Sequence, residues 1–348
     1  MFHHTLARFL AAADSPTADL YFVNACGDFL LGGMRRLGPT VFAAGDTRLV
    51  MRHDLRAEPA DGVERVGRAE RAVRAPAGRR LVYFIDDAVE QGVRDACLPF
   101  LYRQKLRLVE RDTARRVVPA AAAVVVSSPV LARLYSDVAE THVIHPYWSE
   151  AIAGHDHFAR LLGGEGWIDV ACLGSAVHRA DLAFLWPVLG AVLAAHPRVR
   201  LHLPERQRVP PALAGHPRIL AIPGRGWTIY RAALRPRRFH LALYPLMDTP
   251  FNRARSVNKL IEHAVVGAAP LYSRSWPEAW RAGAAGAGLL LGSDPGEWRD
   301  AIEGLLARPG EMLGLAGRAG ELGRALNRPG PQRRLWAHLM EGRLDAAA

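Results

Sequence analysis

Residues 242–273 have the sequence ALYPLMDTPFNRARSVNKLIEHAVVGAAPLYS, which contains a complete strand–helix–strand pattern. One apolar run ends at Tyr244, and a second covers residues 269–272. Between them, apolar residues at spacings i, i+3, i+4, i+7 and i+8 predict a helix over 256–266 that ends at Gly267. Apolar strands that alternate with helices are typical of a parallel sheet covered on both faces. This segment therefore predicts an α/β fold.

The same alternation extends over most of the chain. In the first half we expect strands over 20–24, 40–44, 81–85, 122–126 and 141–144. In the second half we expect strands over 168–173, 199–203, 219–222, 239–244, 269–272 and 288–291. A helix is expected over 29–37, directly after the first strand. The pattern starts again after residues 146–166, which predicts two Rossmann-like domains facing a cleft.

The composition indicates a globular protein with an anionic partner. The chain has 348 residues, of which 50% are hydrophobic and 23% are charged; this suits two domains rather than a disordered chain. Lys and Arg number 45 against 34 Asp and Glu, a net charge of +11. The arginines are spread out without interleaved aromatic residues, so no nucleic-acid partner is expected. The cysteines and histidines lack ligand spacing, so we expect neither a disulfide framework nor a metal site.

The sequence predicts a cytoplasmic protein. The longest apolar runs, 117–126 and 182–195, are shorter than the roughly 20 residues of a membrane-spanning helix. The N-terminal sequence MFHHTLARFLAAADSP has neither a basic start nor a long apolar core, so no signal peptide is predicted. The positive net charge is compatible with loose, peripheral attachment to the anionic inner surface of a membrane.

Ligands of open α/β sheets bind at the carboxyl ends of the strands, and five loops of this chain are expected there. These loops are residues 24–28, 86–87, 127–128, 174–181 and 245–256. The last of them leads into the helix predicted over 256–266. Ser256 is the expected N-cap of that helix, because its hydroxyl can accept a hydrogen bond from the first turn.

This predicted helix carries charged residues that suit a nucleotide. Lys259 and Glu262 lie away from its apolar face, and Arg253 and Arg255 precede its N-terminus. A helix N-terminus with several cations is a good diphosphate site, and a carboxylate one turn later can accept hydrogen bonds from two ribose hydroxyls. The alternative is that Lys259 and Glu262 form only an i, i+3 pair on the protein surface.

Five motifs, in order over most of residues 168–325, resemble those of GT-B-fold glycosyltransferases of the bacterial "group 1", or family 4-like, type. They are Gly174-Ser175 with His178 and Asp181; Trp227-x-x-Tyr230 followed by LALYPL; Asp248-Thr249-Pro250-Phe251-Asn252 with Ser256, Lys259 and Glu262; APLYS; and GLLLGSDPGEW. The resemblance implies an acceptor-side domain over 1–146, a linker over 147–166 and a nucleotide-sugar-binding domain over 167–325. It also implies a C-terminal helix and tail over 326–348 that cross back to the first domain.

The resemblance further implies an activity in polysaccharide biosynthesis. A sugar, here a hexose, would pass from a nucleotide diphosphate sugar to a hydroxyl of a glycan, a lipid-linked glycan or a protein. The resemblance thus implies no tightly bound cofactor, because the nucleotide diphosphate sugar is a donor substrate, and it implies no metal. The donor-binding residues implied by the matching motifs are Gly174, Ser175, His178, Asn252, Arg255, Ser256, Lys259 and Glu262.

One position departs from the family pattern. Many relatives have E-x7-E in this region; Glu262 matches the second Glu, but the first falls on Ala254. This leaves open whether the reaction retains or inverts the anomeric configuration. It also leaves open a catalytically inactive GT-B scaffold that acts as a binding protein. A sugar-nucleotide epimerase on the same fold is the alternative enzyme.

Asp86, Asp87 and Asp28 are the candidate catalytic residues of the first domain. Asp86 and Asp87 follow a buried strand, and YFIDDA resembles the Y-D-I-D-D of some relatives, which implies an acceptor-side carboxylate. Asp28 follows the first expected strand, where GT-B enzymes often approach the acceptor. The alternatives are a helix cap for the Asp86–Asp87 pair and an Asx turn for Asp28.

Overall fold

The structure, a computed structural model, describes residues 15–30, 32–53 and 80–341. The stretch on which the absence of a signal peptide is predicted lies almost entirely outside these residues. The chain divides into two compact units. The first comprises the described parts of Met1–Asp95, Phe100–Tyr147 and Arg328–Ala348, and the second comprises Trp148–Asn327 with Ala96–Pro99.

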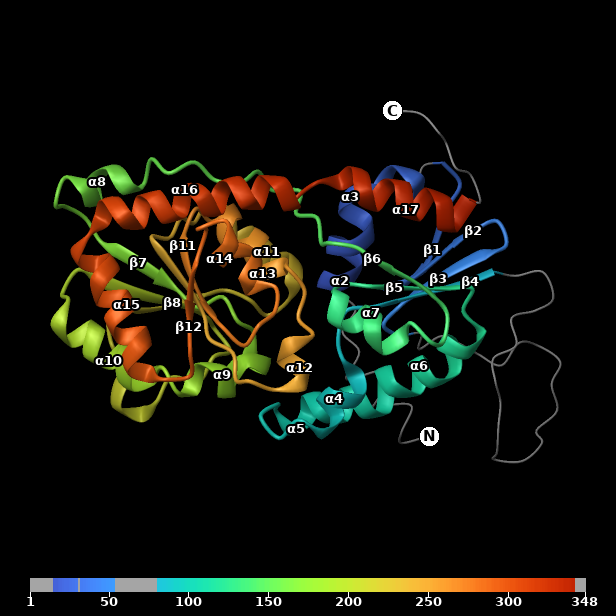
Figure 1. The fold of residues 1–348 in the computed structure, drawn as a ribbon, viewed down its shortest axis with the longest axis horizontal. Helices are drawn as coiled ribbons and strands as arrows, with labels where there is room; N and C mark the ends of the chain where they lie inside the picture. Colours follow the sequence, from blue (N-terminus) through green and yellow to red (C-terminus); the bar gives the residue numbers. More distant parts are fainter. Residues whose placement is uncertain (1–14, 31, 54–79, 342–348) are drawn as a thin grey trace. The chain divides into compact units, whose positions relative to one another are not determined.

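The first unit is built on a six-stranded sheet whose strands lie in sequence order (Figure 1). Its strands are β1 (Arg35–Gly38), β2 (Val41–Ala44), β3 (Thr47–Met51), β4 (Arg80–Ile85), β5 (Ala123–Val126) and β6 (Glu140–Val143). Neighbouring strands are antiparallel from β1 to β3 and parallel from β3 to β6. All four residues of β5 are buried, as expected for a central parallel strand with both faces covered.

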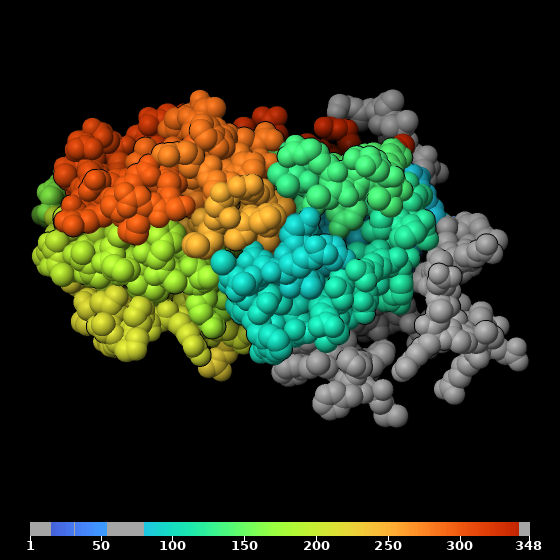
Figure 2. Space-filling view, turned by 60° about the horizontal axis from the view of Figure 1, so that its bottom comes forward, coloured from blue at the N-terminus to red at the C-terminus, as the bar shows by residue number. Residues whose placement is uncertain are grey.

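Helices follow the parallel strands of the first unit. They are α4 (Val89–Arg94), α5 (Phe100–Lys105), the π-helical η3 (Leu106–Glu110), α6 (Arg111–Val117), the 3-10 turn η4 (Val118–Ala120) and α7 (Pro129–Tyr135). Ser128 caps α7, since its hydroxyl accepts a hydrogen bond from the Leu131 N–H at 3.3 Å. In the space-filling view, the cyan-to-teal segment that contains α4, α5 and α6 forms a continuous surface (Figure 2).

The second unit contains a parallel sheet in the order β12-β11-β10-β7-β8-β9 (Figure 1). Its strands are β7 (Ile168–Ala171), β8 (Val199–Pro204), β9 (Ile219–Ile222), β10 (Leu241–Tyr244), β11 (Ala269–Ser273) and β12 (Leu289–Leu291). Helices lie on both sides of this sheet. They are α8 (Phe158–Leu162), η5 (Ala176–His178), α9 (Arg179–Ala183), α10 (Trp186–Ala195), η6 (Pro211–Leu213), α11 (Trp227–Leu234), α12 (Pro250–Arg253), α13 (Asn258–Val265), α14 (Ala279–Ala284), α15 (Pro295–Ala307) and α16 (Pro309–Leu326). The expected α/β class is confirmed.

Residues 20–24 are helical, so the strand expected there is wrong. They belong to a continuous helical segment made of α2 (Pro16–Ala18), η1 (Asp19–Val23), α3 (Asn24–Cys26) and η2 (Gly27–Leu30). The Ser15 side chain caps this segment, and Pro16 occupies its first turn. Leu20, Tyr21 and Phe22 are all buried. A helix whose consecutive residues are buried has the same kind of sequence as a buried strand, because an apolar run of five residues shows no readable period.

The helix expected over 29–37 is also wrong, because it overlaps β1. This strand is an exposed edge that pairs antiparallel with β2 across a tight turn. The sequence RRLG has no alternating apolar pattern that would indicate a strand. Such a pattern is not needed here, because no residue of β1 is fully buried. Its conformation comes from the backbone hydrogen bonds to β2 rather than from side-chain burial.

The C-terminal helix α17 (Pro329–Glu341) packs within the first unit, against α3 and the strands β2 and β3. Trp336 is fully buried, and its Nε1 donates to the Tyr21 carbonyl at 2.7 Å. Gln332 donates to the Leu20 carbonyl at 2.8 Å. The last helix thus completes the core of the unit that contains the start of the described chain.

No single helix among the described residues is long and apolar enough to cross a membrane. The segments Ala176–Ala183 and Trp186–Ala195 pass such a test only as a pair, with a bend of 74° between them. Trp186, Val188, Leu189, Val192 and Leu193 of α10 are buried, so this helix belongs to the core of the second unit.

Candidate functional site

The order of the strands in the second unit creates a switch point between β7 and β10. From β7 the chain proceeds outward through β8 to β9, and from β10 it proceeds outward in the other direction through β11 to β12. The connections after β7 and β10 therefore diverge although the two strands are neighbours. An opening at the carboxyl ends of such strands is the usual ligand site of doubly wound sheets.

The structure brings the eight predicted donor-binding residues to this switch point. Gly174, Ser175 and His178 belong to the connection after β7, and the other five belong to the segment that runs from β10 into α13. The other five are Asn252, Arg255, Ser256, Lys259 and Glu262.

Asp181 joins the two connections. Its Oδ2 lies 2.7 Å from His178 Nδ1, and its Oδ1 accepts from the Met247 N–H at 2.8 Å and from Asn252 Nδ2 at 2.8 Å. Burial opposes ionisation of Asp181, but the hydrogen bond from His178 and nearby positive charge outweigh it and lower its pKa. An ionised Asp181 accepts all three hydrogen bonds. The sequence contained a signal for this role, because Asp181 stands three residues after His178 in the matched motif.

The glycine at position 174 is required by close packing. A Cβ at Gly174 would lie 3.0 Å from His178 Cβ and 3.3 Å from Cγ, so any side chain would push His178 away. Gln207 fixes the same loop, because its Nε2 donates to the Gly174 carbonyl at 2.8 Å and to the Ser175 carbonyl at 2.7 Å. Gln207 follows β8 in the sequence, and no pattern in the sequence connects it to this loop.

Lys259 and Glu262 form a buried ion pair, so their interpretation as a surface pair is wrong. The Glu262 residue is 1% exposed, and Lys259 Nζ donates both to Glu262 Oε2 and to the Leu173 carbonyl, the latter at 2.6 Å. Tyr230 donates to Glu262 Oε1 at 2.7 Å. Burial and the Glu262 carboxylate raise the pKa of Tyr230 well above its ordinary value, so its hydroxyl remains a donor.

The polar face expected on this helix is buried as well. His263 is fully buried and stacks on Tyr272 with ring centroids 5.4 Å apart, and burial lowers its pKa well below the ordinary value. The helix begins at Asn258, and its N-cap position is Val257 rather than the expected Ser256. Ser256 still contributes, since its Oγ accepts from the Asn258 N–H at 3.4 Å.

The cations before α13 differ in their surroundings. The Arg255 guanidinium lies 4.4 Å from the centroid of the Phe251 ring, a cation–π contact that holds it against α12. Arg253 is exposed and pairs with Asp248 at 2.6 Å. Ala254, at the place of the first family Glu, is 1% exposed. Arg255 is therefore the better-placed cation for a ligand at the switch point.

The three carboxylates predicted in the first unit lie in two places. Asp86 and Asp87 follow β4 and pair with the guanidinium of Arg52, at 2.9 Å and 2.6 Å. Asp28 lies on η2 and pairs with Arg333 of α17 at 2.6 Å. Because η2 follows a helix and not a strand, the strand-end argument for Asp28 does not hold. The Arg333 hydrogen bond lowers the pKa of Asp28. Sequence reasoning missed Arg52 entirely.

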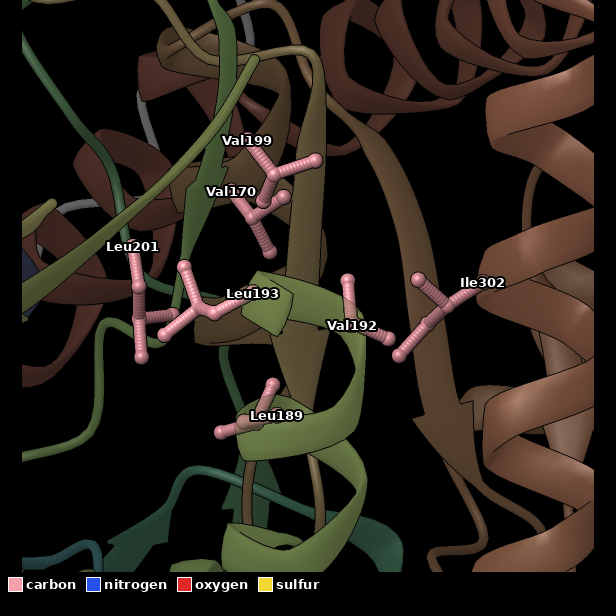
Figure 3. A pocket seen from close by; sticks show the side chains of 7 residues that line it. All are labelled: Val170, Leu189, Val192, Leu193, Val199, Leu201 and Ile302. Atoms are coloured by element: carbon pink, nitrogen blue, oxygen red, sulfur yellow. The ribbon is translucent and has the colours of Figure 1, made fainter. Parts of the chain in front are cut away.

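The described part of the chain contains no group of three His, Cys, Asp or Glu side chains that could hold a metal ion. A small pocket in the second unit is lined entirely by apolar side chains of β7, β8, α10 and α15 (Figure 3). Its lining residues are Val170, Leu189, Val192, Leu193, Val199, Leu201 and Ile302. Since it offers no polar group to a nucleotide, we assign it to imperfect core packing.

The structure is similar to those of several GT-B glycosyltransferases. WaaG, a glycosyltransferase involved in lipopolysaccharide biosynthesis, matches with a TM-score of 0.55 and 14% identity, over 77% of this chain and 79% of WaaG. Anabaena HepE, solved in complex with UDP and glucose, matches with a TM-score of 0.53 and 14% identity, over 76% and 72%. Sucrose-phosphate synthase from Thermosynechococcus elongatus matches with a TM-score of 0.50 and 18% identity, over 76% and 69%. No protein-family model and no curated protein matches the sequence. The chain has the GT-B fold, as its motifs indicated.

Proposed function

We propose that the protein is a nucleotide-sugar-dependent glycosyltransferase that moves a hexose from a nucleotide diphosphate sugar to an acceptor hydroxyl. The observation that carries this proposal is the meeting of the Gly174 loop, Lys259 and Glu262 at the switch point of the second unit. The fold and the motif matches support the same function. The resolved complexes of HepE contain UDP and UDP-glucose, which makes uridine nucleotides the first probes to use.

In this proposal the leaving diphosphate binds between Lys259, Arg255 and the loop at Gly174–Ser175. Lys259 Nζ already contacts the carbonyl that precedes Gly174, so a diphosphate against this loop comes within its reach. Negative charge grows on the diphosphate as the glycosidic bond breaks. Fixed cations and backbone N–H groups in a partly buried site stabilise that charge more in the transition state than in the ground state.

The ribose of the donor is assigned to Glu262. Each carboxylate oxygen carries two lone pairs, so Glu262 retains acceptor capacity beyond its bonds to Tyr230 and Lys259. Because Glu262 is 1% exposed, a ribose reaches it only after the side chains around it rearrange. In this proposal a ribose hydroxyl replaces the Tyr230 hydroxyl as the donor to Glu262 Oε1.

The acceptor is assigned to the first unit, with Asp86 and Asp87 as its carboxylates. They stand at the carboxyl end of β4, where ligands of parallel sheets bind. The acceptor is a hydroxyl of a glycan, a lipid-linked glycan or a protein. The three cysteines, all within the described ranges, form no disulfide, which supports placing the reaction in the cytoplasm.

A ligand screen with a turnover assay tests this function. Thermal shifts are measured with UDP, UDP-glucose, UDP-GlcNAc and the corresponding GDP and ADP compounds, and release of the nucleoside diphosphate is then followed. A ligand at a hundred times its Kd should stabilise the protein by about 2.7 kcal/mol. Arg255→Ala should weaken binding, whereas Arg253→Ala, which removes an exposed cation of the same segment, should not.

The outcomes separate the proposed function from its alternatives. Binding with release of the nucleoside diphosphate supports a glycosyltransferase. Binding without any release favours a binding protein on an inactive scaffold. Conversion of one UDP-sugar into its epimer, followed by NMR, favours an epimerase. Absence of binding by every nucleotide contradicts the donor site and with it the proposal.

A further inference from the structure

The two ring nitrogens of His178 have different surroundings. Nδ1 lies 2.7 Å from Asp181 Oδ2, and the other oxygen of this carboxylate accepts from the Met247 N–H and the Asn252 amide. Because an ionised Asp181 can only accept, Nδ1 carries the hydrogen, and Nε2 of the neutral ring is an unprotonated acceptor. Asp181 thus fixes both the orientation of the His178 ring and its tautomer.

Nε2 of His178 is in contact with solvent. None of the described residues forms a hydrogen bond with it, yet it does not belong to their enclosed polar atoms that lack a partner. The His178 side chain is 11% exposed, and Ser175, in the loop before it, is exposed. The ring packs on the same loop, because a Cβ at Gly174 would lie 3.4 Å from His178 Cδ2, the carbon bonded to Nε2. A ligand on the Gly174–Ser175 loop therefore comes within reach of Nε2.

The groups around His178 favour its neutral form in the free protein. Burial lowers the pKa of His178, and the positive charges of Arg255 and Lys259 lower it further. The Asp181 carboxylate opposes this fall without cancelling it. The Tyr244 ring of β10 packs edge-on against the imidazole at 5.6 Å and is uncharged near neutral pH.

A bound donor changes this balance of charges. The two carboxylates of the site, Asp181 and Glu262, already balance the two cations named above. A nucleotide diphosphate sugar brings two further negative charges, one on each phosphate. An adjacent opposite charge shifts a pKa toward the charged form by about 1–3 units. Without a proton, Nε2 would turn a lone pair toward the lone pairs of the phosphate oxygens.

We propose that His178 binds the donor diphosphate as an imidazolium, and that it takes up a proton from solvent when the donor binds. Nδ1 keeps its hydrogen bond to Asp181, and the new N–H at Nε2 donates to a phosphate oxygen. This inference rests on the proposed glycosyltransferase function, which assigns the diphosphate to the Gly174–Ser175 loop. It adds a third cation to Lys259 and Arg255, and it couples donor affinity to pH.

The sign of this coupling follows from the proton count. The complex holds one proton more than the free protein and the free donor together, so affinity rises as the pH falls. One proton changes the Kd by at most about tenfold per pH unit. With a pKa rise of about 1–3 units on binding, the donor should bind about threefold or more tightly at pH 6 than at pH 8.

Isothermal titration calorimetry of the full-length protein with UDP-glucose tests the inference. Both phosphates of UDP-glucose are bonded to a sugar and to the bridging oxygen, so neither titrates near neutral pH, and any proton uptake belongs to the protein. Titrations in two buffers with different ionisation enthalpies give the number of protons taken up, which should be a measurable fraction of one. If only guanosine or adenosine nucleotides bind in the ligand screen, GDP-glucose or ADP-glucose replaces the probe.

His178→Asn is the test variant, because an Asn amide can take the place of Nδ1 and keep the bond to Asp181 while Nε2 is removed. It should take up no proton, and its affinity should not depend on pH. It should bind UDP-glucose about as well as the parent at pH 8 and about threefold or more weakly at pH 6. His178→Gln, which cannot titrate either, replaces it if His178→Asn does not fold.

His202→Gln is the matched control within the same unit. The His202 side chain is also 11% exposed, and its Nε2 also lies 2.7 Å from a carboxylate, that of Asp169. His202 belongs to β8 and not to a loop of the donor site. This variant should keep the parental proton uptake and the parental dependence of affinity on pH.

The inference is wrong if the parent binds the probe without proton uptake, or if the His178 variants keep the parental uptake. Binding that is weaker by the same factor at every pH would make His178 a structural contact only, and this also overturns the inference. Binding without proton uptake leaves the proposed function intact. If the parent binds no nucleotide sugar at all, the proposed function itself fails and this inference fails with it.

Discussion

Replacing Lys259 by Met should destabilise the second unit far more than the loss of an ordinary surface ion pair. The Lys259 and Glu262 side chains are 13% and 2% exposed, so the substitution leaves a buried carboxylate with Tyr230 as its remaining partner. Breaking a buried pair costs about 3–5 kcal/mol. We expect the lower end, about 3 kcal/mol, because the Tyr230 hydroxyl still donates to Glu262. For a unit of this size that lowers the midpoint of thermal unfolding by roughly 6–12 °C.

A double-mutant cycle isolates the pair. Glu262→Gln should also destabilise, by about 1.5–3 kcal/mol for the lost charged hydrogen bonds. Lys259→Met with Glu262→Gln should cost less than the sum by about 2 kcal/mol, because no unpaired buried charge remains. Urea unfolding of the four proteins gives this coupling energy. The matched control is the Arg308–Glu311 pair, which has the same i, i+3 spacing but side chains that are 57% and 61% exposed.

The same variants separate stability from function. The control cycle with Arg308→Met and Glu311→Gln should stay within about 0.5 kcal/mol of the parent. The Lys259–Glu262 double variant should be about as stable as Lys259→Met alone, although it carries a second substitution, and it should bind UDP at least about tenfold more weakly than the parent, a difference of 1.4 kcal/mol. If Lys259→Met unfolds like Arg308→Met, the pair is not buried. If the double variant binds UDP like the parent, these residues do not form the donor site.

Three further predictions use other parts of the structure. Gly174→Ala should weaken UDP binding at unchanged overall fold, because its Cβ would lie 3.0 Å from His178 Cβ; Gly317→Ala, whose Cβ would meet nothing within 4 Å, should be neutral or stabilising. Stability should fall as the pH drops below about 6.5, the unfolded-state pKa of histidine. Burial lowers the pKa of His157 to about 4, and those of His178, His240 and His263 are lowered too. The folded protein therefore binds fewer protons than the unfolded chain in the window from about pH 6.5 down to 4; urea unfolding at pH 5 and 7 checks this, and equal stabilities would refute it. UDP release should persist in EDTA, and its complete loss, restored by Mg²⁺ or Mn²⁺, would contradict a reaction without metal.

Several strands were predictable from the sequence. The strands expected over 81–85, 122–126 and 219–222 occur as β4, β5 and β9, and each of these apolar runs is followed by residues typical of turns. The strand expected over 20–24 was wrong because this segment is a helix that packs against both the sheet and α17. Its successive residues are buried, so its sequence is the same kind of apolar run as that of a buried strand. Only the cap at Ser15 and the proline after it point to a helix.

The residues of the candidate site that stand in sequence motifs were predictable, but the contacts between residues far apart in the sequence were not. Gly174, Lys259 and Glu262 stand in motifs, and the order of strands explains why they meet. The burial of Glu262 and His263 was not predictable, since it depends on Tyr230 and Tyr272, which come from other elements. Arg52 stands in no motif. Its ion pairs depend on three carboxylates that lie elsewhere in the sequence, over 86–110, and on its own left-handed backbone conformation.

The most direct test of the donor site is a crystal structure of the protein with UDP bound. If the donor site is assigned correctly, diphosphate oxygens lie within hydrogen-bond distance of Lys259 Nζ and of the backbone N–H groups after Gly174. The Tyr230 side chain is then displaced, and the ribose hydroxyls donate to Glu262. Ordered UDP elsewhere on the second unit, with the Lys259–Glu262–Tyr230 contacts intact, would contradict this donor site.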